Sequence, residues 1–162
     1  MDTDQVVREH LRNLLLGGNA HMTFDDAVAD FPAEHFNTRP PQVTYTPWHI
    51  LEHLRITQWD ILEFIRNPHY VSPQWPEGYW PAPSARTDRH GWEQTLASFR
   101  ADLQTLIQMV DDPETNLYQT LPHGEGQTIL REILLVADHN AYHIGEFAIL
   151  RQVMGTWPPG HE

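Results

Sequence analysis

The sequence contains no cysteine and no lysine, since all ten of its basic residues are arginines. The absence of cysteine excludes disulfide bonds, thiolate metal sites, iron–sulfur clusters and cysteine nucleophiles. The absence of lysine excludes Schiff-base chemistry and a lysine general base. Any metal site must therefore use nitrogen and oxygen ligands, and any catalytic group must be a carboxylate, imidazole, phenol or hydroxyl.

Positive charge and long apolar runs are also scarce. The formal net charge is −12, whereas affinity for nucleic acid comes mainly from clustered cations, so we expect no nucleic-acid partner. The sequence shows no apolar run long enough to span a membrane and no charged-then-apolar leader, so we expect no membrane association and a cytoplasmic location. A chain of 162 residues can bury one compact core, and we expect residues 1–162 to form a single domain.

Apolar residues at helical spacing predict four long helices and no convincing strand, which indicates an all-α helix bundle. Thr46-Pro47 is the clearest start, because a capping hydroxyl precedes proline at the first helical position. Residues 116–127 fit either a short hairpin or a plain loop. The predicted long helices cover 4–16, 47 to about 67, 88–112 and 127 or 128 to 155, with a short helical piece between Thr23 and Pro32.

The segment from 68 to 86 has no helical period, and it contains five prolines and, between Val71 and Pro83, three large aromatic residues. A loop of this length in a compact domain is usually either disordered or functional, and the aromatic residues argue against disorder. We expect an ordered Trp/Pro-rich cover over the bundle. Trp75, Tyr79 and Trp80 are candidates for the wall of a pocket, with packing in the core as the alternative.

The last predicted helix carries His139 and His143, four residues apart. At this spacing two imidazoles project from one helix face about 5–6 Å apart at Cβ, close enough to bind one metal ion. The other pair at this spacing, His49 and His53, lies on the second predicted helix, and either residue can supply a third ligand. We favour His53 because it lies within the apolar arc of that helix. Three histidines with an open position are typical of a catalytic metal site.

The same spacing of histidines can also arise without a metal. Eleven histidines in 162 residues produce some pairs by chance, and buried histidines often bond to backbone carbonyls or carboxylates. The spacing also occurs in zinc proteases, where a glutamate that follows the first histidine is the general base. Asn140 has that position here, so a protease is not predicted.

Several residues near these histidines are candidates for supporting roles. Glu146, Glu52 and Asp138 can each accept an imidazole N–H and fix its tautomer, and the alternative for each is a solvated carboxylate. Arg55 can meet an anionic substrate, although a surface ion pair is the simpler role. The other candidates for the lining of the site are His21, His49 and Trp48.

Three segments carry a recognisable pattern: 17–27 (GGNAHMTFDDA), 46–56 (TPWHILEHLRI) and 137–146 (ADHNAYHIGE). Together they resemble the DinB-like superfamily, which includes YfiT-type and mycothiol-dependent enzymes. The resemblance extends over nearly the whole chain, including the Trp/Pro-rich loop. The family pattern combines one histidine in an L-x-H-L-like stretch of the second helix with H-x-x-x-H on the last helix.

The resemblance implies an up-down-down-up four-helix bundle that forms a homodimer and binds a divalent metal, with zinc and nickel as the main candidates. It carries the metal ligands onto His53, His139 and His143. The implied activities are metal-dependent hydrolysis and transfer of low-molecular-weight thiols, in which a metal-activated water or thiolate attacks a small-molecule substrate. The alternatives are a non-catalytic metal-binding bundle with a structural or stress-related role, and a helical interaction module without metal.

Overall fold

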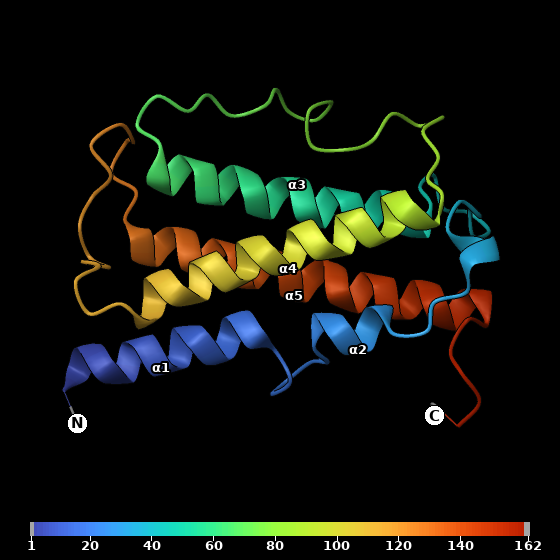
Figure 1. Cartoon of the computed structure of the whole chain (residues 1–162), viewed down its shortest axis with the longest axis horizontal. Helices are drawn as coiled ribbons and strands as arrows, with labels where there is room; N and C mark the ends of the chain where they lie inside the picture. Colours follow the sequence, from blue (N-terminus) through green and yellow to red (C-terminus); the bar gives the residue numbers. More distant parts are fainter. Residues whose placement is uncertain (1, 161–162) are drawn as a thin grey trace.

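The computed structural model describes residues 2–160, which form an all-helical fold (Figure 1). Residues 116–127 form turns closed by one antiparallel bridge between Thr120 and Thr128, so this segment contains no extended hairpin. The helices are α1 (Thr3–Leu16), α2 (Phe24–Val28), α3 (Pro47–Arg66), α4 (Arg89–Asp111) and α5 (Ile129–Met154), with a short 3-10 helix, η1 (Ala33–His35), before α3.

Capping residues fix the ends of the long helices where the sequence predicted them. The Thr46 hydroxyl accepts a backbone N–H from the first turn of α3, and Pro47 follows at the first helical position. Thr128 caps α5 and Asp88 caps α4 in the same way. Gly155 ends α5 with a left-handed φ of 61°, a conformation that glycine adopts without steric cost.

The helix after Thr23 is shorter than predicted, because it ends at Val28 and does not continue to Pro32. The Ala27 carbonyl, which a longer helix would use for its own hydrogen bonding, accepts an N–H from Arg151 at 2.8 Å. Arg151 is fully buried. The sequence of the short helix alone gives no indication of this partner from α5.

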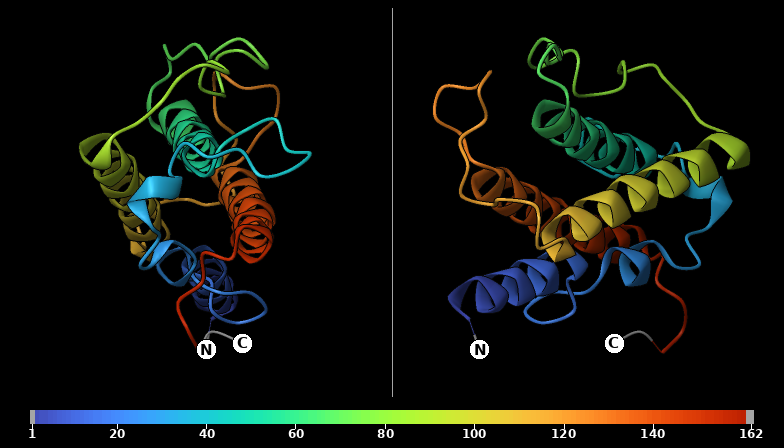
Figure 2. Two further views of the ribbon diagram at one scale, coloured as in Figure 1. Left: turned by 90° about the vertical axis from the view of Figure 1, so that its right-hand side faces the viewer. Right: turned by 60° about the vertical axis from the view of Figure 1, so that its left-hand side comes forward.

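The four long helices form a bundle in which α3 and α1 each contact both α4 and α5. Figure 1 shows α1 and α5 running in one direction and α3 and α4 in the other, which agrees with the expected up-down-down-up order. Because α3 and α4 run in the same direction, the chain must return along the bundle between them. Residues 67–88 make this return along the outer side of α3 (Figures 1 and 2).

Two apolar clusters fill the interior, one towards each end of the bundle. Between them, the buried Gln58 side chain donates to the Phe99 carbonyl at 2.8 Å and accepts from the Asn140 amide at 2.9 Å. Asn140, which stands where a zinc protease has its glutamate, is thus part of a polar layer in the core. Across residues 2–160, no helix is both long and apolar enough for a membrane crossing.

Candidate metal centre

Three histidines from two helices converge beneath the long loop: His53 on α3, and His139 and His143 on α5. The Nε2 atom of His53 lies 3.1 Å from Nε2 of His139 and 3.2 Å from Nε2 of His143. The ligand atoms of the three residues all lie within 4.8 Å of one another. Over residues 2–160 this is the one group of at least three histidine or acidic side chains close enough to share a metal ion. We call these three residues the histidine cluster.

Neighbouring acceptors fix the tautomers of two of the rings. Nδ1 of His53 lies 2.8 Å from the backbone carbonyl of Tyr79, and Nδ1 of His143 lies 2.7 Å from the carboxylate of Glu146. Because a carbonyl and a carboxylate can only accept, both Nδ1 atoms carry the proton. When both rings are neutral, both Nε2 atoms are unprotonated and their lone pairs are available to a metal ion.

This arrangement fits a divalent metal ion. Two lone pairs at 3.2 Å cannot form a hydrogen bond with each other, whereas a cation between them is attracted to both. In a tetrahedral site with Zn–N bonds of 2.0–2.1 Å, two ligand nitrogens lie about 3.3 Å apart, close to the distances in the cluster. Neutral imidazoles suit zinc, copper, iron and nickel. Nδ1 of His139 differs from the other two, because it is buried with no hydrogen-bond partner within the described chain.

Burial keeps the rings of His53 and His139 neutral. Desolvation, opposed by the hydrogen bond to Tyr79 and assisted by the neighbouring His143, lowers the pKa of His53 to about 4. Desolvation and the neighbouring imidazoles lower the pKa of His139 to about 3. The hydrogen bond with His143 holds the pKa of Glu146 below its usual value, so this group stays a carboxylate. His53 and His139 therefore offer unprotonated nitrogens at neutral pH.

Glu146 also connects the cluster to Tyr45, whose hydroxyl donates to the second carboxylate oxygen. Burial and this hydrogen bond raise the pKa of Tyr45, so the phenol keeps its proton and remains a donor. The other two carboxylates considered from the sequence lie elsewhere. Glu52 pairs with Arg55, and Asp138 is exposed. Glu146 is thus the one of the three that contacts a cluster histidine.

The long loop supplies the cover of the cluster. Trp80 stacks on His53 with ring centroids 3.8 Å apart and an interplanar angle of 7°, and its ring centroid lies 6.1 Å from that of His143. Trp75, by contrast, is 67% exposed and packs against Tyr79. Of the aromatic residues considered for the pocket wall, Trp80 therefore contacts the cluster directly.

His49 and His21 have other partners. His49 is buried one turn before His53, and its Nε2 atom lies 2.9 Å from the Ala85 carbonyl. His21 lies in the turn before α2, where its Nδ1 atom is 2.8 Å from the Met22 carbonyl. The structure therefore places His49 beside the cluster but outside it, and does not bring His21 to it.

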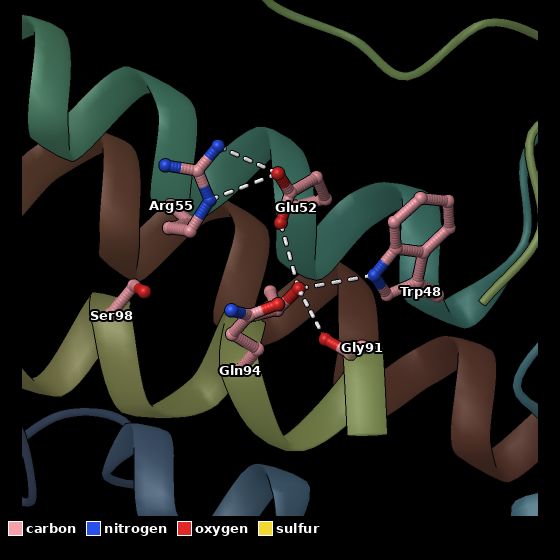
Figure 3. Close-up of a pocket in the computed structure, with 7 residues that line it drawn as sticks. Trp48, Glu52, Arg55, Gly91, Gln94 and Ser98 are labelled. Atoms are coloured by element: carbon pink, nitrogen blue, oxygen red, sulfur yellow. Dashed lines mark hydrogen bonds and ion pairs between the residues drawn. The ribbon is translucent and has the colours of Figure 1, made fainter. Parts of the chain in front are cut away.

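Trp48 lies on a different side of α3, in a pocket of about 290 Å³ between α3 and α4 (Figure 3). Its indole N–H donates to the Thr95 hydroxyl at 3.1 Å, and this hydroxyl donates to Glu52 at 2.7 Å. Glu52 accepts two N–H groups from Arg55. The polar groups of Trp48, Thr95, Glu52 and Arg55 are therefore bonded to one another. Arg55 forms an ion pair, which was the alternative to a contact with an anionic substrate.

A larger pocket, of about 590 Å³, lies beside the histidine cluster, and we call it the cluster pocket. Three of its residues connect it to the cluster: Trp80 stacks on His53, Tyr45 donates to Glu146, and His49 precedes His53 by one turn of α3. This pocket offers space for a small molecule beside the residues that contact the cluster. Its lining comprises Arg39, Val43, Thr44, Tyr45, His49, Trp80, Pro81 and Pro83.

Comparison with curated proteins found no significant match, and neither did comparison with solved structures. A family model described as the DinB superfamily matches residues 19–147. The matched region contains α3, the long loop, α4 and the part of α5 that carries His139, His143 and Glu146. Because the match extends over most of the sequence and includes the whole cluster, the chain belongs to the DinB superfamily.

Proposed function

We propose that His53, His139 and His143 hold a divalent metal ion, zinc or nickel, and that the protein is a metal-dependent hydrolase or low-molecular-weight-thiol transferase. The observation that supports this most strongly is the convergence of the Nε2 atoms, two of which have lone pairs fixed by the hydrogen bonds of their Nδ1 atoms. An ion held by three histidines keeps an open position, where it lowers the pKa of a bound water or thiol and polarises an acceptor group.

The remaining residues have roles in binding and orientation. The Tyr79 carbonyl and Glu146 orient the rings of His53 and His143. Such partners raise the basicity of the ligands and fix their geometry. Trp80 covers His53 and keeps water from that side of the ring. The cluster pocket then provides the space for the substrate.

An open position distinguishes a catalytic site from a closed structural one, and two observations support it. His49, the nearest further histidine on α3, is directed to the Ala85 carbonyl. Glu146 uses its two oxygens for His143 and Tyr45. Neither is therefore free to be a fourth ligand. Because the chain has no cysteine, a thiolate at this site would come from the substrate.

A non-catalytic role is the second candidate. An ion in the cluster would join α3 to α5 near the polar layer between the two apolar clusters, where apolar packing is interrupted. Such an ion would stabilise the bundle whether or not it takes part in a reaction.

The test begins with elemental analysis of the purified wild type and of His139→Ala and His143→Ala variants. We expect one zinc or nickel ion per chain in the wild type and a large loss in each variant. The metal-loaded protein is then assayed for ester hydrolysis and for conjugation of small thiols to a chromogenic electrophile. Equal metal content in all three proteins contradicts the site, and full metal content without either activity favours the structural role.

We also propose a cytoplasmic homodimer without nucleic-acid or membrane partners. The side chains of Tyr142, Ile149 and Val153 are 71%, 66% and 59% exposed and recur along the outer face of α5. Gly145 lies on the same face, where an added Cβ would contact nothing within 4 Å, so another backbone can approach closely. Analytical ultracentrifugation of the wild type and Ile149→Glu tests this, and a wild-type monomer contradicts it.

A further inference from the structure

Two neighbouring pockets beside the histidine cluster contain arginines and no carboxylates. The cluster pocket includes Arg39, and a second pocket of about 300 Å³, which we call the arginine pocket, includes both Arg39 and Arg86. The two pockets share Arg39 and Pro83. The arginine pocket is otherwise lined by Asn37, Thr46, Pro83, Ser84 and Ala85.

This local charge is opposite to that of the whole chain. Aspartate and glutamate outnumber the basic residues 22 to 10, yet the lining of both pockets contains no acidic residue. Neither Arg39 nor Arg86 forms an ion pair with any residue between 2 and 160. The Arg39 guanidinium donates one N–H to the Pro83 carbonyl, which ties it to the long loop and leaves its other donors available.

The wall of the arginine pocket lies on the same helix as the cluster residue His53. Thr46, at the wall of the arginine pocket, precedes His53 by two turns of helix, about 10 Å along α3. On the loop side, the Ala85 carbonyl contacts His49, and Arg86 is the next residue. Between the two ends, the cluster pocket presents mainly apolar and aromatic side chains, among them Val43, Trp80 and Pro81.

We infer that the substrate is an elongated anion whose carboxylate or phosphate binds to Arg39 and Arg86 while its reactive end lies at the histidine cluster. This inference rests on the proposed function. An arginine guanidinium presents a fork of N–H donors that matches carboxylate and phosphate oxygens. Arg55, the cation considered from the sequence, is already paired with Glu52 on the other side of α3.

The test uses cobalt-loaded protein, because a thiolate that binds Co²⁺ gives a sulfur-to-metal charge-transfer band. Three probes of similar length are titrated: mercaptohexanoate, hexanethiol and aminohexanethiol. We expect mercaptohexanoate to bind tightest and aminohexanethiol weakest. We also expect this preference to shrink at high salt, because the arginines are exposed and their interactions are screened.

Variants of the two arginines test whether these residues cause the preference for mercaptohexanoate. Arg39→Gln and Arg86→Gln should each weaken mercaptohexanoate binding about fivefold, the effect of an exposed charge pair, and leave hexanethiol binding unchanged. Arg89→Gln is the matched control, because Arg89 is also exposed and makes no ion pair with a residue between 2 and 160, but lines neither pocket. The control should bind all three probes like the wild type.

The outcomes separate this inference from the proposed function. Equal binding of the three thiols overturns the anion inference and leaves the metal site intact. If no thiol gives a charge-transfer band on cobalt-loaded protein, the thiol part of the proposed function is wrong. Calorimetry with hexanoate, which needs no thiol, then tests the binding of an anion to the arginines. Binding to the wild type that weakens in Arg39→Gln supports the anion inference, and no binding, or equal binding to both proteins, overturns it.

Discussion

The backbone carbonyl of Tyr79 accepts a hydrogen bond from Nδ1 of His53 at 2.8 Å, so a residue of the long loop sets the tautomer of a candidate ligand on α3. The same loop residue is anchored a second time, because its hydroxyl donates to Asp60 on α3 at 2.8 Å. The next residue, Trp80, stacks on the His53 ring. The orientation of His53 therefore depends on the position of the loop.

Tyr79→Phe tests this dependence. The variant removes the donor to Asp60, a buried residue whose other carboxylate oxygen already lacks a partner among residues 2–160. We expect the free energy of unfolding to fall by about 1–3 kcal/mol, the cost of a buried unsatisfied polar group. Zinc affinity should fall as well, because the loop no longer holds the His53 ring as firmly.

Urea unfolding with and without zinc measures both effects. Tyr118→Phe is the control, since Tyr118 is 50% exposed and lies outside the loop. A Tyr79→Phe variant with the stability and zinc affinity of the wild type would show that the loop does not support the cluster.

Glu146→Gln tests the carboxylate that bonds to His143. A glutamine keeps the size of the side chain and an acceptor oxygen but removes the negative charge that strengthens the hydrogen bond to Nδ1. We expect zinc affinity to fall about 10- to 100-fold, the usual effect of losing such a partner. Competition with a chromophoric chelator measures the affinity. Asp138→Asn, an exposed neutralisation on the same helix, should leave it unchanged, and the prediction fails if both variants behave alike.

Much of the fold follows from short-range features of the sequence. Thr46-Pro47, Thr128 and Gly155 determine helix ends through contacts within a few residues, and these ends lie where they were predicted. The predicted end of α2 was wrong by several residues, and at its actual end Arg151, far away in the sequence, donates to the Ala27 carbonyl. Local patterns carry no information about such a partner.

The candidate site also has some features that the sequence predicts and others that it does not. The spacing of His139 and His143 is visible in the sequence, and so is Glu146, which lies within one helical turn of His143. The contribution of Tyr79 could not be predicted, because its acceptor is a backbone carbonyl that any residue possesses. The contact between Glu146 and Tyr45 could not be predicted either, because most of the chain separates the two residues.

The choice between His49 and His53 also needed the structure. Both lie on the same face of α3, and the apolar arc only favoured His53. In the structure, the Ala85 carbonyl of the loop contacts His49, whereas the Tyr79 carbonyl contacts Nδ1 of His53, whose Nε2 atom lies near His139 and His143 of α5. No periodic feature of residues 68–86 predicts which carbonyl meets which imidazole.

The stability of the metal-free protein should depend on pH through the cluster. In the folded chain the pKa values of His53 and His139 are about 4 and 3, whereas a histidine in an unfolded chain titrates near 6.5. Between these values the unfolded chain binds more protons than the folded one. The free energy of unfolding should therefore fall as the pH is lowered from about 6.5 to 4.

Urea unfolding in the presence of a chelator, repeated across this pH range, gives the slope of the free energy of unfolding against pH. In His139→Ala the slope should be smaller than in the wild type, because one of the two contributing groups is gone. His90→Ala, a change at an exposed position of α4, should keep the wild-type slope. Identical slopes in all three proteins would show that the cluster histidines are not held neutral by the fold.

Removal of the metal should lower the melting temperature. An ion that binds only the folded chain stabilises it by about 2.7 kcal/mol when its free concentration is a hundred times the dissociation constant. Differential scanning calorimetry of chelator-treated protein with increasing zinc should therefore show a melting temperature that rises with zinc. The His143→Ala variant should show little rise, and a rise equal to that of the wild type would place the zinc elsewhere.

The convergence of three imidazoles on one ion is tested most directly by the X-ray absorption spectrum of the zinc-loaded protein. We predict a four-coordinate zinc with three imidazole nitrogens at about 2.0–2.1 Å and one light ligand from solvent in the open position. A spectrum without imidazole scattering, or with only one such ring, would contradict the proposed site.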